Sequence, residues 1–145
     1  MNTGDLLGEI KDLHDQYHKL IFLCKEVNIE QVLESKQLEF ETINLNFLLS
    51  EKLLMLSIRE YPLYVEEYVR SFCKDKDKIY CLQHIEILFD KSLEVNPIRL
   101  FENISKQYCL IVHWPGEYKH NSLCYAESGH PEHFICTNFE GKVIY

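Results

Sequence analysis

The chain of 145 residues has no apolar stretch that approaches the roughly 20 residues needed to cross a membrane as a helix. Its first residues also lack the basic and apolar regions of a secretory signal peptide. Positive charge is scarce, since 15 Lys and Arg stand against 23 Asp and Glu and give a formal net charge of −8. These absences predict a cytoplasmic protein without membrane contact, and they disfavour a stand-alone binder of duplex DNA.

Arginine is especially rare, with Arg59, Arg70 and Arg99 as the whole set. Arginine is the side chain that best grips phosphate in a bidentate way, so its scarcity argues against dedicated phosphate or nucleic-acid recognition. Apolar and aromatic residues are plentiful, at 46% and 12% of the total. This composition predicts one packed domain over residues 1–145.

The six cysteines include no C-x-x-C pair, and without a secretion signal we expect reduced thiols. A set of histidines and cysteines in the tail has an H-x3-C-x5-H-x2-H-x2-C spacing, from which two or three members could bind zinc. The set is His120, Cys124, His130, His133 and Cys136. This spacing matches no standard zinc module, so loop histidines and buried thiols are the favoured interpretation and no metal ligand is assigned. A Cys-His nucleophile would need Cys81 or Cys109 beside His84 or His113, but thiols inside apolar strands are inert.

Short apolar runs alternate with amphipathic stretches along the chain. Four runs predict strands, at residues 19–24, 40–46, 79–82 and 108–113. Helical periodicity and capping residues predict helices at 5–17 and 29–37, at 48–59, and from Pro62 and Pro97, with Asn28 and Asn96 as N-caps. The tail is expected to hold short antiparallel pieces at 122–126, 133–137 and 142–145. Strands separated by helices predict an α/β fold, with a mainly parallel sheet flanked by helices on both faces.

Five short sequence blocks follow one another along residues 18–134. They are Lys19–Cys24, Ile43–Asn46 with Leu48-Leu49-Ser50, Ile85–Asp90, Trp114-Pro115-Gly116, and Tyr125-Ala126 with Gly129–Glu132. In this order the blocks resemble the BrxF family, the small P-loop proteins of type III BREX phage-defence systems. The resemblance implies a three-layer P-loop NTPase-like fold related to AAA+ ATPases. It also implies a bacterial, cytoplasmic and antiphage setting.

The chain departs from this family at the phosphate-binding loop. A P-loop needs G-x-x-x-x-G-K-[ST] after the first strand, because backbone N–H groups and the lysine hold phosphates while the hydroxyl holds Mg²⁺. Here the segment has no glycine, and Glu30, Gln31 and Val32 stand at the positions of Gly, Lys and Ser/Thr. Glu26 would repel a triphosphate, as would Glu30. Lys25 precedes the loop and does not replace the motif lysine.

The acidic residues that bind Mg²⁺ and activate water in AAA+ proteins are also missing. After the third strand, Gln83 and His84 stand where the resemblance places Asp and Glu. Glu86 remains as an acid that could face a cleft, although an interaction or structural role is favoured for it. His113 stands at the sensor position after the fourth strand, where a polar residue near the γ-phosphate is expected. The sequence therefore predicts a degenerate nucleotide site of Lys25, Gln83, Glu86 and His113, with no catalytic residue and no cofactor assigned.

Three hypotheses for function remain open. The leading one is a non-catalytic interaction or assembly subunit that docks other BREX defence proteins or self-associates as AAA+ relatives do in rings. An exposed tyrosine stripe of Tyr61, Tyr64 and Tyr68 would suit this role, although such stripes more often pack on a core. The second is an atypical nucleotide-binding ATPase subunit whose site is completed by a partner. The third is DNA engagement within a complex whose other members supply positive charge.

Overall fold

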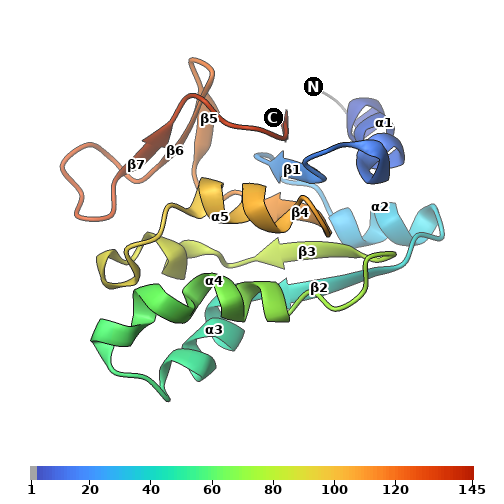
Figure 1. Cartoon of the computed structure of the whole chain (residues 1–145). Coiled ribbons are helices and arrows are strands. Elements are labelled where there is room, and N and C mark those ends of the chain that lie inside the picture. Colours follow the sequence, from blue (N-terminus) through green and yellow to red (C-terminus); the bar gives the residue numbers. More distant parts are fainter. Residues whose placement is uncertain (1–2) are drawn as a thin grey trace.

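The computed structural model describes residues 3–145 and contains two β-sheets (Figure 1). The main sheet has five strands in the order β2-β3-β4-β1-β8, and each neighbouring pair runs parallel. Its strands are β1 (Leu20–Leu23), β2 (Phe40–Asn44), β3 (Ile79–Gln83), β4 (Cys109–His113) and β8 (Lys142–Ile144). The α/β class and the parallel sheet predicted from the sequence are therefore confirmed.

Five α-helices and several 3-10 helices are found in the described residues. The α-helices are α1 (Thr3–Asp12), α2 (Ile29–Ser35), α3 (Leu45–Leu53), α4 (Tyr61–Ser71) and α5 (Pro97–Ile104). The 3-10 helices are η1 (Leu13–Asp15), η2 (Ile58–Glu60), η3 (Glu86–Phe89) and η4 (Lys91–Leu93). None of the helices within residues 3–145 is long and apolar enough to span a membrane.

Two hydrophobic cores lie on opposite faces of the main sheet, because successive side chains of a strand point to opposite sides. From β1, Ile21 and Leu23 pack with side chains of α1 and α2. Leu20 and Phe22 of the same strand pack with side chains of α3, α4 and α5. The sheet is thus the middle of three layers, and burial on both faces explains why its strands are apolar runs.

Asparagine side chains start three of the helices. Asn28 caps α2 and Asn96 caps α5, as predicted, and their Oδ1 atoms accept backbone N–H bonds at 3.0–3.3 Å. Asn44 caps α3 in the same way, at 3.1 Å from the accepted nitrogen. The sequence pattern does not predict this third cap, which starts α3 at Leu45 instead of Leu48.

The helix predicted at residues 5–17 ends earlier than expected. Its first three core positions are buried, but Tyr17 is 72% exposed and lies beyond both α1 and η1. The backbone of Gln16 is already extended, because the chain has left the helix to enter β1. Helical periodicity therefore continues one turn further in the sequence than in the structure.

The tail forms a second, antiparallel sheet in the order β5-β6-β7. Its strands are β5 (Glu117–Lys119), β6 (Ser122–Tyr125) and β7 (Phe134–Cys136). The antiparallel pieces predicted at 122–126 and 133–137 are confirmed, whereas β5 is not predicted.

The antiparallel piece predicted at residues 142–145 is wrong, because β8 lies parallel to β1 in the main sheet. The N–H of Cys24 donates to the carbonyl of Ile144 at 2.7 Å. Gly141 has a φ of +98°, and a Cβ there would lie 3.1 Å from the backbone oxygen of Leu20. Glycine therefore permits this close return of the chain. The connection from β4 to β8 runs through the second sheet and contains no helix, so helical periodicity does not reveal it.

Candidate functional site

A cleft of about 440 Å³ lies where the carboxyl ends of β1, β3 and β4 meet. All four residues of the predicted degenerate site line it: Lys25, Gln83, Glu86 and His113. They meet because β1, β3 and β4 run parallel, so the residues that follow them lie at the same edge of the sheet. Open parallel sheets bind ligands at this edge. The sequence thus predicts which residues line the cleft, but it does not identify a ligand.

The loop between β1 and α2 lacks the features of a phosphate cradle. Residues 24–28 contain no glycine, and α2 has only seven residues. The side chain of Asn28 accepts the N–H of Gln31 at 3.1 Å, so the start of α2 is capped by the chain itself. Glu26 lines the cleft beside Lys25. These residues do not fit a magnesium-bound triphosphate.

The segment after β3 is held by its backbone. His84 has a φ of +55°, which is uncommon for a residue with a Cβ. Its carbonyl accepts the N–H of Asn46 at 2.9 Å and so ties the end of β3 to the first turn of α3. Glu86 then begins η3, which is anchored by the buried Leu88 and Phe89. Glu86 therefore lines the cleft from a fixed segment.

The segment Trp114-Pro115-Gly116, which follows β4, also lines the cleft. Trp114 Nε1 donates to the carbonyl of Cys124 at 3.0 Å, and its ring meets those of Phe22 and Phe89 edge-on at 5.9 and 5.6 Å. A Cβ at Gly116 would collide with the same Cys124 carbonyl. This segment therefore fixes β6 against the cleft and has a clear structural role.

Charge in the cleft is mixed. Its lining includes one lysine, Lys25, and two glutamates, Glu26 and Glu86. Burial raises the pKa of the Cys24 thiol to about 12, so this thiol is neutral at physiological pH. With neutral histidines, these lining residues carry no net positive charge, whereas phosphate sites gather cations and N–H donors.

The thiols of Cys81 and Cys109, the two candidate nucleophiles, are protonated. Burial raises the pKa of Cys81 to about 12 and that of Cys109 to about 11. Cys109 contacts His14 rather than His84 or His113, with 3.2 Å between Sγ and Nδ1. Protonated, buried thiols are poor nucleophiles, as their place in apolar strands predicts.

The histidines and cysteines of the tail do not assemble into a metal site. Within residues 3–145, no group of three or more His, Cys, Asp and Glu side chains could hold a metal ion. His130 Nδ1 accepts the N–H of Glu132 at 3.0 Å, and His133 Nδ1 lies 3.2 Å from the carbonyl of Ala126. These histidines therefore stabilise turns of the second sheet.

A second candidate site lies on the segment that connects α3 to α4, which is at the lower left of Figure 1, and on the start of α4. The helix predicted at residues 48–59 ends at Leu53, and four large apolar side chains in the next residues are 65–85% exposed. We name them the hairpin surface: Leu54, Met55, Ile58 and Leu63. Single exposed apolar residues are normal, whereas four of them within residues 54–63 make this segment a candidate interaction site. Its sequence signal is that Leu54, Met55 and Ile58 fall outside the apolar stripe of the predicted helix.

The predicted tyrosine stripe is only partly a surface. Tyr61 and Tyr68 are half-buried and pack against the core, whereas Tyr64 is 36% exposed. The rings of Tyr64 and Tyr68 stack at 5.9 Å, and Lys52 Nζ lies 5.8 Å from the Tyr68 ring centre. Tyr64 is therefore the most exposed member of the stripe, and its ring stacks on that of Tyr68.

Comparison with known proteins gives no match. No family model matches the chain, no curated protein matches its sequence and no solved structure matches its fold. A proposal for function must therefore rest on the cleft, the hairpin surface and the charge of the chain itself.

Proposed function

We propose that this chain is a non-catalytic interaction or assembly subunit of a bacterial BREX-type antiphage defence system, built on a P-loop-like scaffold. It acts in the cytoplasm by docking other BREX defence proteins, and it meets DNA only through them. The observation that carries this proposal is the hairpin surface, whose four apolar side chains are mostly exposed. Burial of such a cluster against a partner removes it from water and stabilises the complex.

The strand order supports the P-loop-like part of the proposal. AAA+-related sheets place the first strand between the fourth and the fifth, with the third and second beyond the fourth. The order β2-β3-β4-β1-β8 agrees with this arrangement if β8 counts as the fifth strand. The cleft after β1 then corresponds to a nucleotide site, and its glycine-free loop and mixed charge favour a scaffold without ATP hydrolysis.

A binding experiment with purified components tests the docking role. The chain is mixed with each purified protein of a type III BREX system, and the mass of every mixture is measured by light scattering. We expect one stable complex, and we expect the Leu54→Ser/Met55→Ser double variant to weaken it at least about tenfold, as loss of interface anchors does. Ile135→Ser is the matched control, because Ile135 is 58% exposed on β7, outside the hairpin surface. Equal affinities for the two variants, or no complex with any component, would contradict the proposal.

A second candidate function is an atypical nucleotide-binding ATPase subunit whose site is completed by a partner. The convergence of Lys25, Gln83, Glu86 and His113 in one cleft favours it. Calorimetry with ATP, ADP and GTP, with and without Mg²⁺, separates it from the leading proposal. We expect no binding up to millimolar nucleotide, either for the isolated chain or for its complex with the docking partner. Mg²⁺-dependent binding that is lost in Lys25→Ala or Glu86→Ala would favour the second function.

A further inference from the structure

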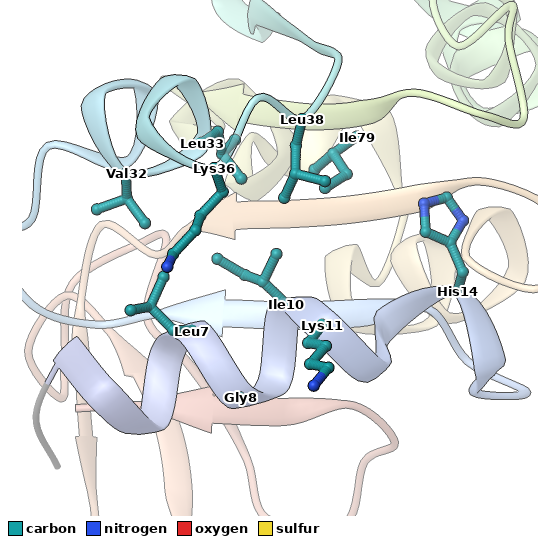
Figure 2. Close-up of a pocket in the computed structure, with 10 residues that line it drawn as sticks. All are labelled: Leu7, Gly8, Ile10, Lys11, His14, Val32, Leu33, Lys36, Leu38 and Ile79. Atoms are coloured by element: carbon teal, nitrogen blue, oxygen red, sulfur yellow. The ribbon is translucent and has the colours of Figure 1, made fainter.

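A cavity of about 400 Å³ lies between α1 and α2, away from the cleft and the hairpin surface (Figure 2). Its walls are largely apolar and come from both helices and from the amino ends of β2 and β3. The apolar side chains are Leu7, Ile10, Val32, Leu33, Leu38 and Ile79. Cavities of this size and character are typical of sites for small organic ligands.

The ionisable side chains that line this cavity are all basic. They are Lys11, His14 and Lys36, with no carboxylate among the lining residues, although the whole chain has a net charge of −8. In Figure 2, Lys36 extends from α2 towards Leu7 on α1 and so brings its ammonium group over the apolar wall. His14 is held in place by Cys109, whose Sγ lies 3.2 Å from Nδ1. A ligand that fits both features has an apolar body and a negative head.

We propose that this cavity binds a single-chain aliphatic carboxylate, with the chain between α1 and α2 and the carboxylate at Lys36. The apolar walls would take the methylene groups out of water, which is favourable for each group buried. The lysine would pair with the carboxylate in a charge-assisted hydrogen bond. This inference is independent of the docking function, since none of the cavity residues belongs to the hairpin surface.

Calorimetry with octanoate, decanoate and dodecanoate, each below its micelle-forming concentration, tests the site. We expect saturable binding of one molecule per chain, with affinity rising about fourfold per added methylene until the cavity is filled. Decanoate should bind more tightly than decanol or decylammonium, because only the carboxylate pairs with Lys36. No saturable binding, or equal binding of the three head groups, would overturn the proposal. Binding only to phosphatidylglycerol vesicles in a flotation assay would also overturn it, since that result indicates a membrane surface.

Two variants locate the binding. Lys36→Glu should weaken decanoate binding about ten- to a hundredfold, because a charged hydrogen bond is replaced by repulsion. Lys91→Glu is the matched control, since Lys91 is an exposed lysine on η4 that does not line this cavity. Val32→Phe should fill the cavity and abolish binding, with circular dichroism to verify that the variant is folded. Equal affinities for Lys36→Glu and Lys91→Glu would show that the carboxylate lies elsewhere.

Discussion

The two faces of the main sheet are packed to different degrees. On one face, α3, α4 and α5 close over the strands, and Phe22 meets Phe101, Trp114 and Phe139 at ring-centre distances of 5.6–6.4 Å. On the other face, α1 and α2 leave a cavity of about 400 Å³. Alternate residues of the same strands therefore border a dense core on one side and an incomplete one on the other. We therefore expect the α3–α5 face to contribute most to stability, whereas the α1–α2 face has room for a ligand.

The largest effect is expected from a large-to-small change on the dense face. Phe22 is fully buried among three aromatic rings, so Phe22→Ala should lower the free energy of unfolding by about 3–5 kcal/mol. Urea denaturation measures this change. Ile21→Val, at the neighbouring residue on the opposite face, is the control and should lower it by about 0.5–1.5 kcal/mol. A loss for Phe22→Ala as small as that for Ile21→Val would show that Phe22 is not tightly packed.

The same substitution made on both faces tests their packing directly. Leu49 of α3 and Leu33 of α2 are both fully buried, but Leu33 borders the cavity. Loss of a buried leucine side chain costs about 2–5 kcal/mol, depending on how many contacts are lost. We expect the loss for Leu49→Ala to fall in the upper part of this range. The loss for Leu33→Ala should be smaller than that for Leu49→Ala by about 1 kcal/mol or more. A larger loss for Leu33→Ala in urea denaturation would mean that the α1–α2 face is the more tightly packed.

A stabilising change is expected on the open face. Gly8 lies inside α1, and a Cβ built there meets no atom within 4 Å. Gly8→Ala should therefore raise the free energy of unfolding by about 0.5–1 kcal/mol, because alanine loses less backbone entropy in a helix. Gly141→Ala is the contrasting variant and should be destabilising, since Gly141 has a φ of +98° and a Cβ there would lie 3.0 Å from the Leu20 side chain. Thermal denaturation of both proteins checks the opposite signs.

The smallest effect concerns the outer edge of the dense face. The backbone N–H and the hydroxyl of Ser57 donate to Glu60 Oε1 at 3.0 and 2.9 Å, and these bonds lower the pKa of Glu60 from its ordinary value. A carboxyl whose pKa is lower in the folded state stabilises the protein above its unfolded-state pKa. This stabilisation is lost as the pH falls through the folded-state pKa. Glu60→Gln should therefore lower the melting temperature at pH 7, and the difference should shrink on acidification. Ser57→Ala keeps the backbone donor, so it should lower the melting temperature less than Glu60→Gln does. If the difference in melting temperature between Glu60→Gln and the unmodified protein were the same at all pH values, the role given to the Glu60 carboxylate would be contradicted.

The sequence predicts four of the five strands of the main sheet and the position of the cleft, because both depend on local patterns. Apolar runs identify the buried strands, Asn28 and Asn96 mark helix starts, and parallel strands necessarily bring Lys25 and His113 to one edge. The parallel pairing of β8 depends on a tertiary approach at Gly141, which no local pattern encodes.

The hairpin surface and the cavity are harder to predict from the sequence than the strands and helices that form the core. The hairpin surface exists because α3 ends at Leu53, and the residues beyond it leave the stripe that a longer helix would have buried. The contact between Cys109 and His14 joins segments that are distant in sequence, so spacing alone cannot find it. The cavity between α1 and α2 is a volume that the packed side chains leave empty, and volume is not a property of any single residue.

The position of β1 in the main sheet determines when this strand can pair with its neighbours during synthesis. β1 pairs with β4 on one side and with β8 on the other, so both neighbours of this early strand are made late. Contacts between distant parts of a chain form slowly, because a long loop must close first. While the ribosome makes the intervening residues, the backbone groups of Leu20–Leu23 have no strand beside them. The nascent chain thus carries an unpaired, wholly apolar strand until β4 emerges, and this is the interval in which a chaperone would protect it from aggregation.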